Sequence, residues 1–206
     1  MTEFLRRPEG NTPEEQQDKA DILELINFER YCRDNALWDE MRKCFTEDST
    51  VSISWYEGSG DGFVTASSKM GTYAPHKIHN TLTWINSDRA VTVMMATIQM
   101  RRVIDGVECE LSSDAQLHFS TVKKEGKWYI CRFESIYEQD RLMPILPDAT
   151  LSMDSIWLSK YRKSYACMSY MMEKNGFGAN QELPGIDRPD LVKAMRDRLS
   201  AWLDGE

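Results

Sequence analysis

The stretch HKIHNTLTWINSDRAVTVMMATIQMRRV, residues 76–103, decides the fold class. Both of its halves are rich in β-branched and aromatic residues, which favour β-strands, and the Asn-Ser-Asp sequence between them is typical of a turn. Two similar runs follow at residues 107–122 and 128–138, after the turn sequences IDG and KKEGK. We therefore predict about four long antiparallel strands between residues 76 and 138.

The segment before these strands has helical periodicity instead. Thr12 and Pro13 are a typical N-cap and first helical residue, and the apolar residues after them recur at helical spacing. A second short helix is expected next, followed by a strand at residues 50–56, a turn at EGSGDG and a weak helix at residues 63–72. Because helices and long strands are segregated along the chain, the predicted fold class is α+β.

The composition changes again towards the C-terminus, where Pro-containing sequences separate further helical segments. We divide the chain into a flexible N-terminus (1–14), an α+β domain (15–140) and a C-terminal arm with helices (141–206). The tail carries aromatic residues that either the domain or another subunit must cover: Trp157, Tyr161, Tyr165 and Tyr170. We therefore expect a homo-oligomer, either a trimer or a dimer.

Charge and composition exclude several classes of partner. The formal net charge of −8 and the isoelectric point near 5.0 argue against binding to nucleic acid or an anionic membrane. Five cysteines without a CxxC spacing fit neither a disulfide framework nor a zinc site, and no leader-like or membrane-spanning run is visible, so we expect a cytoplasmic protein. Twelve methionines and six tryptophans either fill the core or line an apolar cavity for a flat ligand.

Three stretches, in this order, resemble the SnoaL-like branch of the nuclear-transport-factor-2-like superfamily: RYCRDNALWDEMRKCFTEDSTVSI (30–53), HKIHNTLTWINSDRAV (76–91) and GKWYICRFESIYEQDR (126–141). In that family, an Asp at the end of a helix precedes a Trp by four residues, as Asp34 precedes Trp38. A His opens the next long strand four residues before an Asn or Gly, as His76 precedes Asn80.

The resemblance implies a cone-shaped, curved antiparallel sheet that packs on N-terminal helices and encloses an apolar pocket. The tail is similar to C-terminal helical extensions found in some members. Most members act without a metal or an organic cofactor, so the resemblance implies that none is needed here.

The resemblance further implies that Asp34 orients His76 and that His76 acts as a general base. On this interpretation the chain is a cofactor-independent lyase that acts on a small, hydrophobic aromatic or polycyclic alcohol, by dehydration or by retro-aldol loss of formaldehyde. Without the family pattern, Asp34 could equally be a helix cap and His76 a strand residue bonded to the backbone. Other hypotheses also stay open: a non-catalytic binding or assembly module, an isomerase or polyketide cyclase, and the β-subunit scaffold of an aromatic-ring dioxygenase.

Several further residues are candidates for contact with a substrate. Tyr31 lies about one helical turn before Asp34 and could donate a hydrogen bond to a substrate oxygen, or it could belong to the core. Trp55 and Tyr56 end the predicted first strand on opposite faces, so only one of them should face the pocket.

The strand around residues 94–101 supplies the remaining candidates. Its uniformly apolar face is expected to pack on the helices, whereas the mixed face with Gln99 and Arg101 resembles a pocket wall. An inward Arg101 would stabilise an oxyanion in the transition state. His79 falls on the face opposite His76 in a regular strand, which argues against a shared metal site, but it is kept as a candidate for substrate contact.

Overall fold

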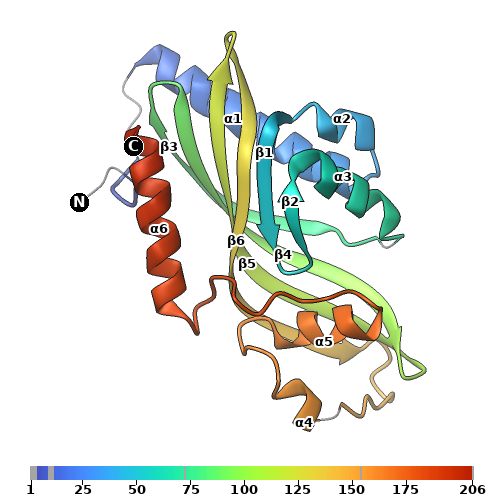
Figure 1. Ribbon diagram of the computed structural model, residues 1–206. Helices are drawn as coiled ribbons and strands as arrows, with labels where there is room; N and C mark the ends of the chain where they lie inside the picture. Colours follow the sequence, from blue (N-terminus) through green and yellow to red (C-terminus); the bar gives the residue numbers. More distant parts are fainter. Residues whose placement is uncertain (1–3, 9–11, 72, 154, 206) are drawn as a thin grey trace.

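The structure is a computed structural model that describes residues 4–8, 12–71, 73–153 and 155–205 (Figure 1). It has an α+β fold with one curved, open, six-stranded sheet, N-terminal helices, and further helices after the last strand. The elements in chain order are α1 (Pro13–Asp34), α2 (Trp38–Arg42), β1 (Phe45–Ile53), β2 (Tyr56–Ser59), α3 (Gly60–Lys69), β3 (His76–Asn86), β4 (Arg89–Ile104), β5 (Val107–Lys124), β6 (Lys127–Pro144), α4 (Ser155–Leu158), α5 (Ala166–Lys174) and α6 (Pro189–Asp204).

Helix α1 begins where the local sequence predicts it. The Thr12 hydroxyl accepts a hydrogen bond from the Glu15 backbone N–H at 3.1 Å, and the Glu15 carboxylate accepts one from the Thr12 N–H at 3.2 Å, which makes a capping box. Ile22 and Ile26 are fully buried further along the helix. The C-terminal end of α1 contacts β3, and this brings Asp34 to the first residue of that strand.

The strand order of the sheet is β2-β1-β6-β5-β4-β3. The neighbours are antiparallel except for β1 and β6, which run parallel, a pairing that the sequence did not predict. The four long strands are confirmed. The expected turn at EGSGDG is wrong in part, because Tyr56–Ser59 pairs with β1 as strand β2 and Gly60 already belongs to α3.

The curvature of the sheet arises in its longest strands. In the β5–β6 pair the register shifts between Asp114 and Ala115 and again between Ser120 and Thr121. The β3–β4 pair has a further irregularity between Ile78 and Thr81. Bulges of this kind bend a strand and increase its twist, so the sheet curls around the helices on one of its faces (Figure 1).

Helices cover both faces of the sheet. Helices α1 and α3 pack on the face that holds the main hydrophobic core. Helix α6 packs on the other face, where Met195, Leu199 and Leu203 form a second apolar cluster with Trp84 and Ile136. The pocket described below lies on the side of α1 and α3, so α6 does not line it.

The C-terminal extension differs from its prediction in one respect. The expected single helix is interrupted between Leu158 and Ala166, which leaves the short α4 and the longer α5. Tyr161, Tyr165 and Tyr170 are buried within the chain itself, so these aromatics need no second subunit to cover them. The side chain of the fourth aromatic residue, Trp157, lies outside the described residues, and the oligomeric state stays a prediction.

The N-terminal segment was expected to be flexible over residues 1–14, of which 1–3 and 9–11 lie outside the described residues. Phe4 is buried, and its ring packs edge-on against Trp84 at 5.1 Å. The Trp84 indole N–H donates a hydrogen bond to the Arg6 carbonyl at 2.7 Å. The described part of this segment is therefore held against the sheet. None of the helices in the described ranges is long and apolar enough to cross a lipid bilayer.

Candidate active site

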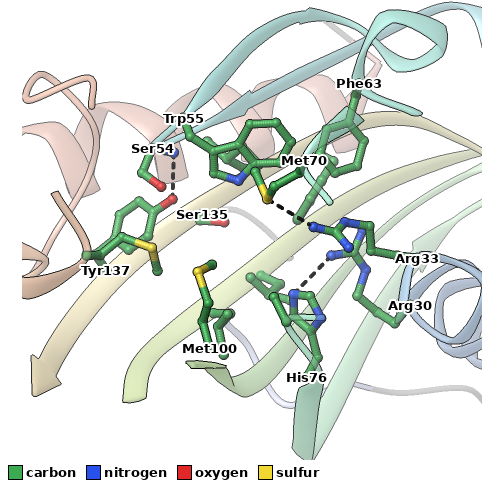
Figure 2. A pocket seen from close by; sticks show the side chains of 16 residues that line it. Arg30, Arg33, Ser54, Trp55, Phe63, Met70, His76, Met100, Ser135 and Tyr137 are labelled. Atoms are coloured by element: carbon green, nitrogen blue, oxygen red, sulfur yellow. Dashed lines mark hydrogen bonds between the residues drawn. The ribbon is translucent and has the colours of Figure 1, made fainter. Parts of the chain in front are cut away.

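A small pocket lies between α1, α3, α5 and the sheet (Figure 2). Its volume is about 50 Å³. Most of its wall is apolar and aromatic, and the polar groups lie in two places. On one side, Arg30 and Arg33 of α1 face His76; across the pocket lie Ser54, Ser135 and Tyr137 (Figure 2). The remaining lining residues are Ile53, Trp55, Phe63, Met70, Ala74, Ile98, Met100, Leu117, Phe133 and Met168.

Asp34 and His76 form a hydrogen-bonded pair behind one wall of this pocket. The Asp34 carboxylate accepts two hydrogen bonds from the same residue, one from the His76 backbone N–H at 2.7 Å and one from the ring Nδ1 at 2.8 Å. Both side chains are largely buried. Because an ionised carboxylate only accepts hydrogen bonds, Nδ1 carries the proton, and Nε2 of a neutral ring keeps its lone pair on the pocket side.

The surroundings keep the His76 ring neutral. Burial lowers the pKa of His76, the hydrogen bond to Asp34 opposes this effect, and the cations of Arg30 and Arg33 add to the lowering. Burial would raise the pKa of the Asp34 carboxyl, but the hydrogen bonds from His76 hold it below its usual value. The pair thus consists of a carboxylate and a neutral imidazole near pH 7, which is the protonation state that a general base requires.

Arg30 is fixed by a buried ion pair with its neighbour in the chain. Its Nε and Nη2 atoms donate to the two carboxylate oxygens of Glu29, both at 2.5 Å. Its guanidinium also stacks on the ring of Phe133, with 4.8 Å between Cζ and the ring centroid. The third nitrogen, Nη1, lies 3.4 Å from Nε2 of His76 (Figure 2). Since Arg only donates, this contact again requires the lone pair on Nε2.

Arg33 lies beside Arg30 and has a different environment. Only 6% of its surface is exposed, and its Nη2 donates to the sulfur of Met70 at 3.6 Å (Figure 2). The ring of Trp38 lies 6.0 Å from its Cζ. Burial, together with repulsion from Arg30, lowers the pKa of Arg33 to about 10, so the side chain is still a cation at neutral pH.

A phenol lies on the opposite side of the pocket from His76. The Tyr137 hydroxyl accepts a hydrogen bond from the Ser54 backbone N–H at 2.7 Å, and burial raises the pKa of this phenol (Figure 2). Tyr137 is therefore protonated near neutral pH. Of the two aromatic candidates at the end of the first predicted strand, Trp55 lines the pocket.

Five of the candidates for substrate contact do not line this pocket: Tyr31, Tyr56, His79, Gln99 and Arg101. Tyr31 is 58% exposed, because it lies about 60° around α1 from Asp34, on the side away from the sheet. Tyr56 packs beside Trp55, and its hydroxyl donates to the Ser59 carbonyl at 3.0 Å.

The assignment of the two faces of β4 was wrong. His76 pairs with Ile98, and residues paired in this way share a face, so Ile98 and Met100 point into the pocket while Gln99 and Arg101 point outward. Arg101 forms a surface ion pair with Glu110 at 3.0 Å. The prediction assigned the helices to one face of β4 and the pocket to the other. In the structure, the same apolar face of β4 packs on the helices and lines the pocket.

His79 also lies on the outer face of the sheet. It is exposed, and its Nε2 lies 2.8 Å from the Thr97 hydroxyl, which donates to Asp114 at 2.7 Å. His76 and His79 therefore do not meet. In the part of the chain that the structure describes, no group of three or more His, Cys, Asp or Glu side chains has the arrangement of a metal site.

The comparisons with known proteins agree with this fold. A model of the SnoaL-like domain matches residues 14–134. An uncharacterised protein of Emericella nidulans is 31% identical over 92% of this chain and 87% of its own length, and the pea pathogenicity protein 2 of Fusarium vanettenii is 28% identical over the same shares.

Two solved structures have the same fold at low sequence identity. A candidate scytalone dehydratase from Novosphingobium aromaticivorans has a TM-score of 0.52 and 18% identity over 66% of this chain and 97% of its own. A type 2 hexachlorocyclohexane dehydrochlorinase, LinA, has a TM-score of 0.56 and 10% identity over 67% and 97%. From the match of the domain model over more than half of its length, this chain belongs to the SnoaL-like domain family.

Proposed function

We propose that this chain is a cofactor-independent lyase in which His76 is the general base. The observation that carries the proposal is the buried Asp34–His76 pair, whose geometry directs the lone pair of Nε2 into the pocket, where only the long 3.4 Å contact from Nη1 of Arg30 meets it among the described residues. Asp34 is acceptor-only, so it fixes the tautomer and stabilises the imidazolium that forms when His76 takes a proton. The names of the two structural neighbours, a dehydratase and a dehydrochlorinase, both denote eliminations and support the same reaction class by analogy.

Two reactions fit this base. In a dehydration, Nε2 takes a proton from the carbon next to the C–OH group, the C–H electron pair becomes the double bond, and the C–O bond breaks. The departing oxygen takes the electron pair of that bond and a proton from the imidazolium, and it leaves as water. In a retro-aldol step, Nε2 takes the hydroxyl proton, the C–C bond breaks to release formaldehyde, and the carbanion takes the proton back.

The pocket favours a small substrate. A volume of about 50 Å³ holds a few water molecules, whereas a cavity that binds benzene measures about 150 Å³. Met70, Met100 and Met168 line the pocket, and methionine side chains rearrange easily. We therefore favour a single-ring aromatic alcohol over a polycyclic one, bound after these side chains move aside.

The test compares wild type, His76→Ala and the matched control His79→Ala, which changes the exposed histidine of the same strand. Each protein is incubated with EDTA and a panel of hydroxylated aromatic compounds, and the products are identified by mass spectrometry. With wild type and the control, we expect a product that is lighter than its substrate by about 18 mass units (loss of water) or about 30 (loss of formaldehyde). With His76→Ala we expect no such product. Equal turnover by all three proteins would exclude His76 as the base. Binding of the panel without any turnover by wild type would favour a binding module.

A further inference from the structure

Arg33 occupies a position that a core residue normally fills. In a helix with about 100° per residue, Ile22, Ile26 and Arg33 lie within about 40° of one another around the axis of α1. These two isoleucines are fully buried, and Arg33 continues the same stripe into the pocket. A cation therefore lies where the buried face of α1 borders the pocket.

The carboxylates near Arg33 are already used by other groups. Both oxygens of Glu29 accept hydrogen bonds from Arg30, and both oxygens of Asp34 accept from His76. Among the described residues, the sulfur of Met70 is the only acceptor that receives a hydrogen bond from the Arg33 guanidinium. A thioether is a weak acceptor, and a guanidinium has five N–H donors.

This arrangement is energetically unfavourable for Arg33. Burial disfavours the Arg33 cation and the neighbouring Arg30 cation repels it, whereas the Asp34 and Glu29 carboxylates offset part of this cost without accepting a hydrogen bond from Arg33. Buried ionisable groups whose pKa is shifted by burial and by a neighbouring charge are frequent at functional sites. The rest of the pocket wall offers flat apolar surfaces in Trp55, Phe63 and Phe133.

We propose that the Arg33 guanidinium is the binding site for a carboxylate, so that the ligand of this pocket is a small aromatic carboxylate. The planar fork of the guanidinium matches the two oxygens of a carboxylate, and the ring of the ligand packs among the aromatic side chains. Where the inference names a substrate, it rests on the proposed lyase function: the substrate is then a hydroxylated aromatic carboxylate with its hydroxyl-bearing carbon near His76. The binding itself needs no turnover.

The experiment measures binding of matched probe pairs by isothermal titration calorimetry: benzoate against benzamide, and 2-naphthoate against 2-naphthamide. The members of each pair have nearly the same shape and differ in charge. In wild type we expect at least one carboxylate to bind about tenfold or more tightly than its amide, as a charge-assisted bidentate contact implies. If no carboxylate binds more tightly than its amide, the assignment of Arg33 is wrong, and this comparison needs no variant.

Three variants locate the effect. Arg33→Gln should abolish the preference for the carboxylate, and Arg33→Lys should retain part of it, because lysine supplies a charge but no fork. Arg42→Gln is the matched control, since Arg42 is on α2, pairs with Asp61 at 2.8 Å and does not line the pocket. A preference that survives Arg33→Gln unchanged in a folded protein would overturn the proposal.

The same titrations in His76→Ala separate the two hypotheses. A variant that loses turnover but keeps the carboxylate preference supports both of them. A wild type that prefers carboxylates but converts no hydroxylated compound contradicts the lyase and leaves the Arg33 site standing. A wild type that is active but indifferent to the carboxylate contradicts the Arg33 site and leaves the lyase standing.

Discussion

Asp34→Asn is the substitution that tests the site most directly, because it keeps the shape of the side chain and removes its charge. The carboxylate accepts from the His76 backbone N–H at 2.7 Å and from Nδ1 at 2.8 Å. An amide offers one oxygen and one NH₂ group, so it can accept only one of these two hydrogen bonds. If its oxygen keeps the backbone N–H, the NH₂ group faces Nδ1 and forces the proton onto Nε2. His76 then lacks the lone pair that faces the pocket.

The size of the effect follows from this loss. General base catalysis contributes about 10²–10⁴-fold, so kcat/KM should fall by that factor, which corresponds to about 3–5 kcal/mol in the activation barrier. Stability should fall less. One hydrogen bond to a charged group is lost and the other becomes neutral, and we expect a decrease of about 1.5–3 kcal/mol in the free energy of unfolding.

The assay combines kcat/KM on a turned-over substrate, urea unfolding, and ¹⁵N NMR of the imidazole nitrogens, which reports the tautomer. Asp39→Asn is the matched control, because Asp39 is an almost fully exposed carboxylate on α2 whose ion pair with Arg42 lies at the surface. A folded Asp34→Asn protein with the proton on Nε2 and a kcat/KM within about threefold of wild type would refute the reasoning. Asp34 would then only anchor the start of β3.

The other predictions concern pH and buried charges. Because the pKa of His76 is lowered in the folded protein, kcat/KM should reach half of its maximum at a pH below 6.5 and level off at higher pH; a midpoint above 6.5 would contradict a neutral His76 base. Glu29→Gln should destabilise the fold by about 3–5 kcal/mol in urea unfolding, since it leaves Arg30 buried without its anion, whereas Glu40→Gln at the surface should change stability by less than about 0.5 kcal/mol. Burial lowers the pKa of His118 from 6.5 to about 4. Between these pH values the unfolded chain therefore binds more protons than the folded chain. About 3 kcal/mol of the free energy of unfolding, present above pH 6.5, should be lost as the pH falls to about 4. His118→Gln should flatten that part of the pH–stability profile, and an unchanged profile would exclude His118 as its origin.

Local sequence patterns predict the regular parts of this fold and miss the parts that depend on distant pairing. The capping box at Thr12 and the long alternating strands are local signals, and they appear where expected. Strand β2 contains Gly58 and only four residues, so it exists because β1 pairs with it and not because of its own propensity. The parallel pairing of β1 with β6 joins segments about 80 residues apart, and no periodicity within either strand encodes it.

The sequence predicted those residues of the candidate site that match a pattern of the resembled family. The Asp34 and His76 positions came from such a pattern, and the structure brings the two side chains together. Arg30 and Arg33 were missed because neither arginine was considered for the buried face of α1. The angle of each residue around the axis of α1, measured from the buried isoleucines, would have indicated these two arginines. Arg30 lies about 40° from Asp34 on the side of the buried isoleucines, and Tyr31 about 60° away on the opposite side.

The charges around the pocket link the base to the proposed anion site. Two carboxylates, Glu29 and Asp34, balance two cations, Arg30 and Arg33, so the group is neutral while His76 is neutral. A proton on His76 would place a charge in a buried, apolar pocket and leave the group with one uncompensated positive charge, which is why proton uptake by His76 is unfavourable.

A carboxylate bound at Arg33 would remove this obstacle, because its charge offsets the cation and allows His76 to take a proton. His76 should therefore become a stronger base when the site is occupied. By linkage, a ligand that raises the pKa of His76 must itself bind more tightly where His76 is protonated. We expect benzoate to bind wild type several-fold more tightly at about pH 5.5 than at about pH 8, and His76→Ala to lose this difference. Equal affinity at both pH values would show that the bound carboxylate and His76 do not interact electrostatically. The carboxylate would then bind at a site other than Arg33.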